Sequence, residues 1–160
     1  MSKSQAHTLA RELGKQGPFS SLQQEVFLNL LRTSTQLHRQ FVCLFESVGV
    51  TDTQYNVLRI LQGHGKPMQI YQIMEHLITP QADISRLVDR MSKAALISRA
   101  PCKTDRRAVW IQLAAKGRGV LKKLAKPLDE MHLSQFSNLS QLELATLNEL
   151  LFRARQPDGK

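Results

Sequence analysis

Residues 79–113 combine a helical pattern with a hairpin pattern, and this combination constrains the fold more than any other stretch. Thr79 is a favourable N-cap, Pro80 suits the first helical position, and no further Pro or Gly follows until Pro101. Apolar residues then recur at helical spacing in one stripe, namely Ile84, Leu87, Val88, Met91 and Ala95. We therefore expect an amphipathic helix that begins at Thr79.

The second half of this stretch predicts two strands joined by a cationic loop. Strand patterns cover 97–100 and 108–113, and the second alternates apolar and polar residues like a half-buried strand. The loop carries Lys103, Thr104, Asp105, Arg106 and Arg107. A helix with a cationic outer face followed by such a hairpin is typical of a winged helix. In that arrangement the helix enters the major groove of DNA, and the hairpin contacts the backbone or the minor groove.

The net charge of +9 comes entirely from residues 79–126, which are the helix–hairpin stretch and the segment that follows it. Twelve of the 22 Lys and Arg residues lie within 79–126 together with three of the 13 acidic residues, and the remaining ten of each cancel. Clustered cations displace the counterions of nucleic-acid phosphates. This confinement favours polyanion binding over a basic face that serves solubility alone.

Two short helices are expected before this stretch. Thr51 and Gln54 have the spacing of a capping box and open a helix that glycines end near residue 65. A second helix covers 69–77, and the tight connection to the next helix is that of a helix-turn-helix. We assign 51–115 to a winged helix-turn-helix DNA-binding domain, so the fold class is mostly α with a small β-hairpin wing.

Long amphipathic helices flank this domain. Residues 21–48 lack Gly and Pro, and their apolar residues recur at helical spacings, namely Val26, Leu30, Leu37, Phe41, Leu44 and Val48. In 116–155, Ser140 and Glu143 form a second capping box. We expect residues 21–48 and 116–155 to form a dimerisation region. A helical core within one chain is the alternative. Residues 1–20 predict an extension with a weak helix, and 156–160 a tail.

The order of elements and the string ISRLVDRMSKAALISRAPCKTDRRAVWIQLAAKG resemble the MarR family of bacterial winged helix-turn-helix regulators. The resemblance covers roughly 21–155, and its most specific parts are 85–90, the DRR of 105–107, and Lys116–Gly117. It implies an obligate homodimer that binds pseudo-palindromic promoter DNA, commonly as a repressor. It also implies, for many members, release of DNA when a small aromatic or anionic compound binds or a cysteine is oxidised.

The sequence departs from the family pattern at two alanines. Ala95 stands where the family usually has Gly after the recognition helix, and a positive φ there would cost Ala about 1 kcal/mol. Ala114 stands where the family often has Thr before the next helix, so that helix start is poorly capped. Neither departure removes a candidate DNA contact.

The candidate DNA contacts lie on the helix and on the hairpin loop. They are Gln81, Asp83, Ser85, Arg86, Arg90, Lys103, Thr104, Arg106 and Arg107, with Asp105 orienting a wing arginine. An arginine can hold guanine or a phosphate with two hydrogen bonds. Asp83 has three interpretations: it accepts from cytosine, it orients an arginine, or it only favours the helix dipole. Asp89 and Arg90 have a structural ion pair as an alternative role.

Two further features bear on regulation. His38, Phe41, Phe45 and Tyr55 are candidates for an effector pocket, although their spacing equally suits core residues. Cys43 and Cys102 are candidates for a redox switch, because adjacent cations favour a thiolate at Cys102, although idle thiols are commoner.

Other classes of protein fit less well. The five histidines are scattered, and no HExxH, CxxC, phosphate loop or serine elbow is present, so we expect no enzyme, cofactor or metal. The alternative is a winged-helix module that binds protein or RNA without an operator. With no apolar run long enough for a membrane span and no signal-peptide pattern, we expect a cytoplasmic protein.

Overall fold

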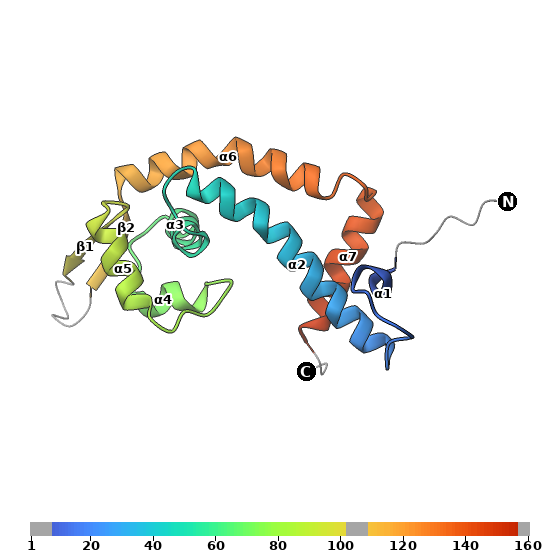
Figure 1. Ribbon diagram of the computed structural model, residues 1–160. Helices are drawn as coiled ribbons and strands as arrows, with labels where there is room; N and C mark the ends of the chain where they lie inside the picture. Colours follow the sequence, from blue (N-terminus) through green and yellow to red (C-terminus); the bar gives the residue numbers. More distant parts are fainter. Residues whose placement is uncertain (1–7, 102–108, 157–160) are drawn as a thin grey trace. The chain divides into compact units, whose positions relative to one another are not determined.

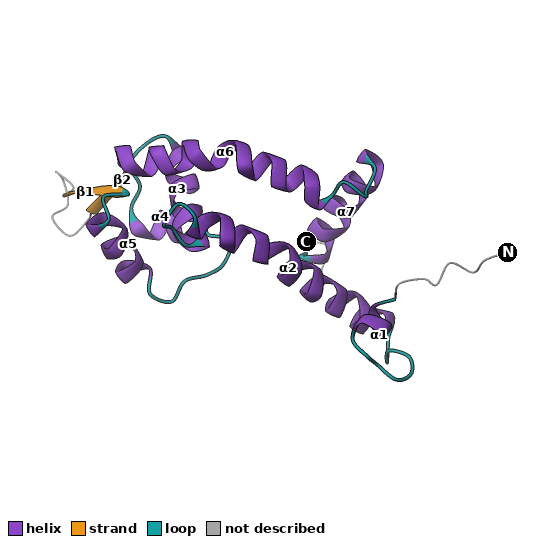
Figure 2. Cartoon of the chain, turned by 45° about the horizontal axis from the view of Figure 1, so that its top comes forward, coloured by secondary structure: helices purple, strands orange, loops and turns teal. Residues whose placement is uncertain are grey.

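The computed structural model describes residues 8–101 and 109–156 and is mostly helical (Figure 1). Its elements are α1 (Leu9–Glu12), α2 (Leu22–Glu46), α3 (Asp52–His64), α4 (Ile70–Glu75), α5 (Ile84–Lys93), β1 (Ile97–Pro101), β2 (Val109–Leu113), α6 (Ala115–Gln135) and α7 (Gln141–Ala154). Figure 2 shows the two strands as one short hairpin among helices. The expected fold class is thereby confirmed.

The chain divides into two units, one up to Val42 and one from Cys43 onward. In the first unit, α1 is the weak helix predicted in the N-terminal extension. Arg32 Nε on α2 lies 2.6 Å from Glu12 Oε2 on α1, and Leu9 is buried. Within this unit, the ion pair joins α1 to α2.

The second unit holds the hydrophobic core. Helix α3 contacts α4, β2 and α6, while α5 contacts α4 and β1 (Figure 1). The largest fully buried side chains come from α3, α4, α5, β2, α6 and the loop before α4, and they are Val57, Leu58, Met68, Ile73, Val88, Met91, Ile111 and Leu124. The helix-turn-helix and the hairpin therefore share one core, which fixes α5 relative to the strands.

The hairpin is antiparallel and gains a third partner from the loop before α4. Ile97 pairs with Leu113, and Pro101 with Val109. In addition, the Met68 N–H donates to the Ile111 carbonyl at 3.0 Å, and the Ile111 N–H donates to the Met68 carbonyl at 2.8 Å. A bridge of one residue has no period in the sequence, which is why it was not predicted.

The helices begin at the residues that capping chemistry predicts, except that α5 begins later than expected. The capping boxes at Thr51 and Ser140 are confirmed, and Ala114 makes no side-chain cap before α6, as expected. The predicted N-cap Thr79 is wrong, because α5 begins at Ile84 and its N-cap is Asp83. The Asp83 side chain accepts a hydrogen bond from the Arg86 N–H at 3.2 Å, and aspartate is a stronger N-cap than threonine.

Ala95, in the turn after α5, differs from one expectation and confirms another. Ala95 does not continue the buried stripe, because the helix ends at Lys93 and Ala95 is exposed in the turn. Its φ is 56°, so the position does require the left-handed conformation that favours glycine. Lys116 Nζ donates to the carbonyl of Ala94 at 3.0 Å, which places a cation at the helix C-terminus.

Candidate nucleic-acid interface

The outer face of α5 is polar, cationic and open to solvent. Ser85, Arg86 and Arg90 are exposed, while Gln81 is half-buried and precedes the helix. The inner face is buried and consists of Ile84, Leu87, Val88 and Met91. Because burial of this stripe fixes the rotation of α5 about its axis, the predicted contacts on α5 share the solvent side.

One carboxylate both caps α5 and holds an arginine. Asp83 Oδ2 lies 3.0 Å from Arg86 Nε, while Oδ1 accepts the hydrogen bond from the Arg86 N–H. The Arg86 side chain is still 83% exposed. Of the three interpretations of Asp83, this geometry matches two, namely the orientation of Arg86 and a carboxylate that favours the helix N-terminus.

A second carboxylate joins the helix to the hairpin. Asp89 Oδ1 lies 2.5 Å from Arg99 Nη1 on β1, so the suggested Asp89–Arg90 ion pair is wrong. The partners sit ten residues apart on different elements, and helix spacing gives no signal for such a pair. Arg99, which links the cationic face of α5 to the hairpin, therefore carries no signal in the sequence.

The predicted wing contacts fall on a part of the chain outside the described residues. They are Lys103, Thr104, Arg106 and Arg107 with the orienting Asp105, and the redox candidate Cys102 also lies outside the described residues. Beside that segment, Pro101 and Val109 are paired across the hairpin, so both strands extend up to it.

The unit formed by α5, the hairpin and their shared core resembles parts of known proteins. A model of the MarR family matches residues 48–108. The HTH-type transcriptional regulator MhqR of Bacillus subtilis (strain 168) is 32% identical over 110 residues, covering 66% of this chain and 72% of the relative. The chain belongs to the MarR family.

Solved structures of MarR proteins share the fold. A MarR transcription factor from Planctomyces limnophilus is 33% identical with a TM-score of 0.65, covering 84% of this chain and 98% of that one. A mutant MarR from E. coli, complexed with operator DNA, is 20% identical with a TM-score of 0.74, covering 84% and 99%. This chain is therefore a DNA-binding transcriptional regulator of the MarR type with a winged-helix fold, and the family and relatives are regulators rather than enzymes.

The residues considered for effector binding in this MarR protein are divided between the two units. Phe45 and Tyr55, in the second unit, stack with ring centroids 4.5 Å apart and an interplanar angle of 21°. His38 and Phe41 belong to the first unit, so a pocket made by all four stays a prediction. Cys43 is exposed, which makes its thiol accessible to oxidants.

Tyr55, on α3 in the second unit, has a shifted pKa. Burial raises the pKa of the Tyr55 hydroxyl above its ordinary value, the Arg59 cation lowers it, and the Asp129 carboxylate raises it. Burial and the Asp129 carboxylate together outweigh the Arg59 cation, so the neutral form of the Tyr55 hydroxyl is favoured. Such a group can donate a hydrogen bond to an anionic or phenolic ligand.

Within the described residues, no group of three or more His, Cys, Asp or Glu side chains could hold a metal ion. None of the helices in the described ranges is long and apolar enough to cross a membrane.

Proposed function

We propose that this protein binds a pseudo-palindromic operator as a homodimer and represses transcription from the adjoining promoter. The observation that carries this proposal is the outer face of α5, where Asp83 holds Arg86 and Asp89 pairs with Arg99 on β1, while the opposite side of the helix is buried. A rigid cationic helix matches the major groove, and repression follows when the bound dimer occupies the site of the polymerase.

In this proposal, Gln81, Ser85, Arg86 and Arg90 contact DNA from α5 and the residues just before it. Arg106 and Arg107 enter the minor groove, Asp105 orients one of them, and Lys103 and Thr104 contact phosphates. Asp83 acts by positioning Arg86, as its two contacts with that residue suggest.

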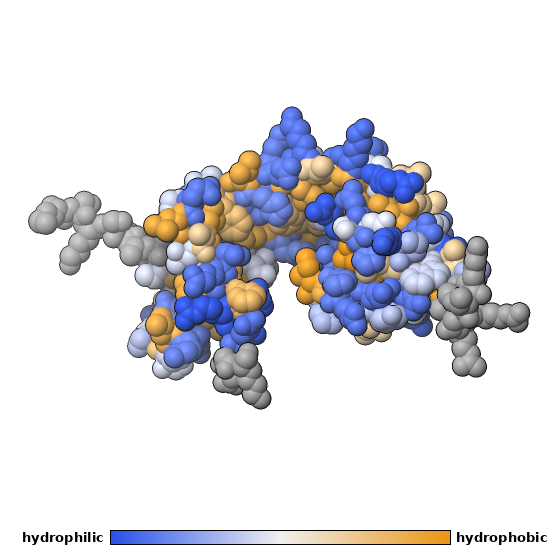
Figure 3. Space-filling model, turned by 180° about the vertical axis from the view of Figure 1, so that it is seen from behind, coloured by the Kyte–Doolittle hydropathy of each residue, from blue (hydrophilic) through white to orange (hydrophobic). Residues whose placement is uncertain are grey.

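Exposed apolar residues support the homodimer. In the first unit, α2 exposes Leu22, Val26, Phe27, Leu30 and Leu31. In the second unit, α7 has no buried residue and exposes Leu142, Leu147, Leu150 and Phe152. Figure 3 shows apolar side chains on the surface of one face of the molecule. Large exposed apolar surfaces commonly mark protein–protein interfaces.

The domain assignment follows from this proposal. Residues 51–115 form the DNA-binding domain, and 21–48 with 116–155 form the dimerisation region. A two-fold axis would then place the two α5 helices about 34–36 Å apart, which is one turn of DNA. The proposal predicts half-sites separated by one helical turn.

Operator binding is tested with Arg86→Ala on a promoter fragment located by footprinting upstream of the protein's own gene. We expect affinity for the operator to fall by roughly tenfold to a hundredfold, because a bidentate arginine contact contributes about 1–3 kcal/mol. Lys122→Ala is the matched control, since it removes one exposed cation from α6 rather than α5. Fluorescence anisotropy over a salt series measures both affinities.

Two results would overturn operator binding. One is wild-type affinity of the Arg86→Ala protein for the operator. The other is equal displacement of the operator by duplex DNA, single-stranded DNA and RNA, which would indicate an interaction module without sequence specificity. Transcription in vitro from the footprinted promoter tests repression, and activation by the bound protein would contradict it.

The homodimer is tested by sedimentation of the Leu30→Glu and Leu150→Glu proteins. Each substitution places a carboxylate in an exposed apolar surface, and we expect the monomer to predominate because a charge buried in an interface is strongly unfavourable. A wild-type chain that sediments as a monomer at micromolar concentration would refute the dimer directly.

We further propose that a small aromatic or anionic compound, or oxidation of a cysteine, releases the DNA. The stacked Phe45–Tyr55 pair and the exposed Cys43 support these two routes. Peroxide should release DNA from the wild type and leave the Cys43→Ser, Cys102→Ser double variant bound. Equal release from both proteins would exclude the oxidation route.

A further inference from the structure

The connection between α4 and α5 is longer than the tight turn expected from the sequence. Helix α4 ends at Glu75 and α5 begins at Ile84, so residues 76–83 lie outside both helices. A helix-turn-helix commonly has a connection of about three or four residues. Because every residue in a connection adds backbone freedom that is lost when the chain is ordered, this segment needs contacts of its own to fix where α5 begins.

The middle of this segment is held through its backbone rather than through its side chains. The Ile78 side chain is 85% exposed, and Thr79 and Pro80 are exposed as well. The Ile78 N–H donates to Asn56 Oδ1 on α3 at 3.2 Å. Within the described residues, no other hydrogen bond joins 76–83 to an element other than α4 and α5. Asn56 therefore tethers the segment at its middle.

The tether connects the hydrophobic core to the start of α5. Next to Asn56 on α3, Val57 and Leu58 are fully buried in the core that α3 shares with α4, β2 and α6. Burial of these side chains fixes the position of α3, and Asn56 itself is half-buried. At the other end of the tether, residues 79–83 lead from Ile78 into α5 and include the N-cap of that helix. A fixed amide on α3 thus restrains the chain that enters α5.

We propose that Asn56 is a positioning residue for sequence readout by α5 and acts without contacting DNA itself. Its amide oxygen holds residues 76–83 in the conformation that presents Gln81 and the first turn of α5 to base edges. This inference rests on the operator binding proposed above. Base-edge contacts require this part of the chain in one register, whereas non-specific binding comes from attraction between cations and phosphates. Loss of the tether should therefore lower affinity for the operator more than affinity for other duplex DNA.

The test compares the footprinted operator with a non-operator duplex of equal length by fluorescence anisotropy. Asn56→Ala removes the acceptor oxygen and places a strong helix former in α3. A neutral hydrogen bond corresponds to a factor of about two to ten in an equilibrium constant, and a dimer would lose this bond twice. We expect operator affinity to fall by about fourfold to a hundredfold and non-operator affinity to stay within about twofold of the wild type.

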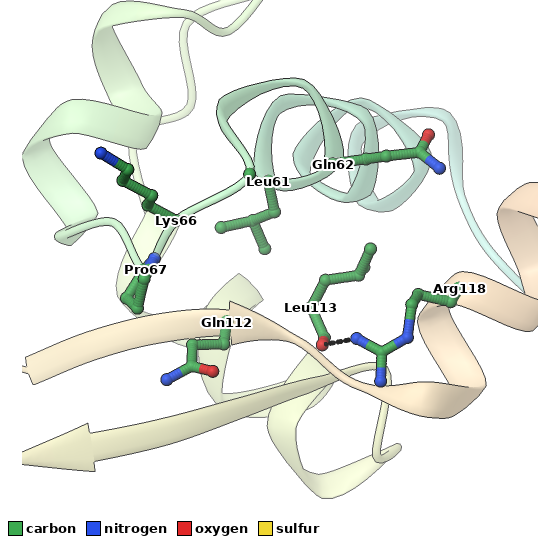
Figure 4. Close-up of a pocket in the computed structure, with 8 residues that line it drawn as sticks. Leu61, Gln62, Lys66, Pro67, Gln112, Leu113 and Arg118 are labelled. Atoms are coloured by element: carbon green, nitrogen blue, oxygen red, sulfur yellow. Dashed lines mark hydrogen bonds between the residues drawn. The ribbon is translucent and has the colours of Figure 1, made fainter.

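Two further variants separate the tether from general damage to α3. Asn56→Asp keeps an oxygen acceptor, so its ratio of operator to non-operator affinity should stay within about threefold of the wild type. Gln62→Ala is the matched control, because Gln62 Oε1 also accepts a side-chain hydrogen bond at 3.2 Å, but from Arg59 Nη1 within α3. Figure 4 shows Gln62 on α3 near the junction of β2 with α6. Its removal should leave the ratio unchanged.

Hydrogen exchange of the Ile78 amide tests the tether without DNA. Exchange should be faster in Asn56→Ala than in the wild type, and unchanged in Gln62→Ala. If the wild type bound no operator, the proposed function would fail while faster exchange in Asn56→Ala still established the tether. If the wild type bound its operator, an unchanged affinity ratio in Asn56→Ala would overturn the inference alone. An equal loss of affinity for both duplexes, an equal effect of Gln62→Ala, or an equal loss in Asn56→Asp would also overturn it.

Discussion

Ala95 holds the left-handed conformation at the end of α5, and its replacement by glycine should stabilise the protein. The φ of Ala95 is 56°, and Ala95 is exposed, so its methyl group contributes little packing. The residue directly follows the C-cap Ala94 and directly precedes the buried Leu96. A change in backbone strain here therefore acts on the join between the recognition helix and the wing.

The magnitude follows from two opposing contributions to the free energy of unfolding. A left-handed conformation costs an L-residue about 1–2 kcal/mol, and glycine avoids this cost. Glycine also makes the unfolded chain more flexible, which costs about 0.4–1 kcal/mol. For Ala95→Gly we expect a net gain of about 0.5–1 kcal/mol, or an increase in Tm of roughly 2–3 °C for a chain of this size.

Urea unfolding followed by circular dichroism measures this gain, with Ala94→Gly as the control on the neighbouring residue. Ala94 has φ −79° and ψ 1°, a conformation without the left-handed strain. Glycine there should lower stability by about 0.5–1 kcal/mol through the unfolded state alone. If Ala95→Gly destabilised the protein as much as Ala94→Gly does, the strain assigned to Ala95 would be refuted.

Three further predictions follow from α6 and its neighbours. Ala114→Thr should supply the missing N-cap of α6 and raise the free energy of unfolding by about 1 kcal/mol in urea, and no gain would contradict it. Gly117→Ala should cost about 1–3 kcal/mol, since a Cβ there would approach the Leu96 carbonyl too closely, whereas Gly119→Ala, with open space, should be neutral or stabilising. In ultraviolet titration, Tyr55 should ionise above pH 10.0, and Asp129→Asn should lower that midpoint. An unchanged midpoint would refute the electrostatic influence of Asp129 on Tyr55.

The sign of the pH dependence at Tyr55 is fixed by its raised pKa. A hydroxyl whose pKa is higher in the folded state than in the unfolded state contributes stability below the unfolded pKa of 10.0. That contribution is lost as the pH rises through the folded pKa. The Tyr55→Phe protein should therefore lose less stability than the wild type between neutral and strongly alkaline pH.

Local chemistry was sufficient to predict most of the fold from the sequence. Capping boxes depend on residues three apart, so Thr51 and Ser140 could be recognised without knowledge of the rest of the chain. The hairpin followed from alternation, and the strained turn at Ala95 followed from the resemblance to a family with glycine there. In each case the determining residues lie within a few positions of one another.

Expectations failed where a choice depended on competition or on distant partners. Thr79 and Asp83 both suit an N-cap, and propensity alone does not exclude the earlier start. The Ile78 N–H donates to Asn56 Oδ1 at 3.2 Å, so a contact with α3 fixes the turn before α5. No period in the sequence joins residues 22 positions apart.

The distant contacts share one consequence, since each of them holds α5 or the hairpin in place within the second unit. Arg99 joins β1 to α5 through Asp89, Lys116 reaches the C-terminal carbonyl of α5, and Met68 pairs with β2. Groove contacts by a helix and a wing require a fixed separation between them, because a rigid interface avoids the entropic cost of ordering on binding. These residues lie beside the candidate DNA contacts, so we expect their loss to weaken operator binding without removing any of the proposed contacts to DNA.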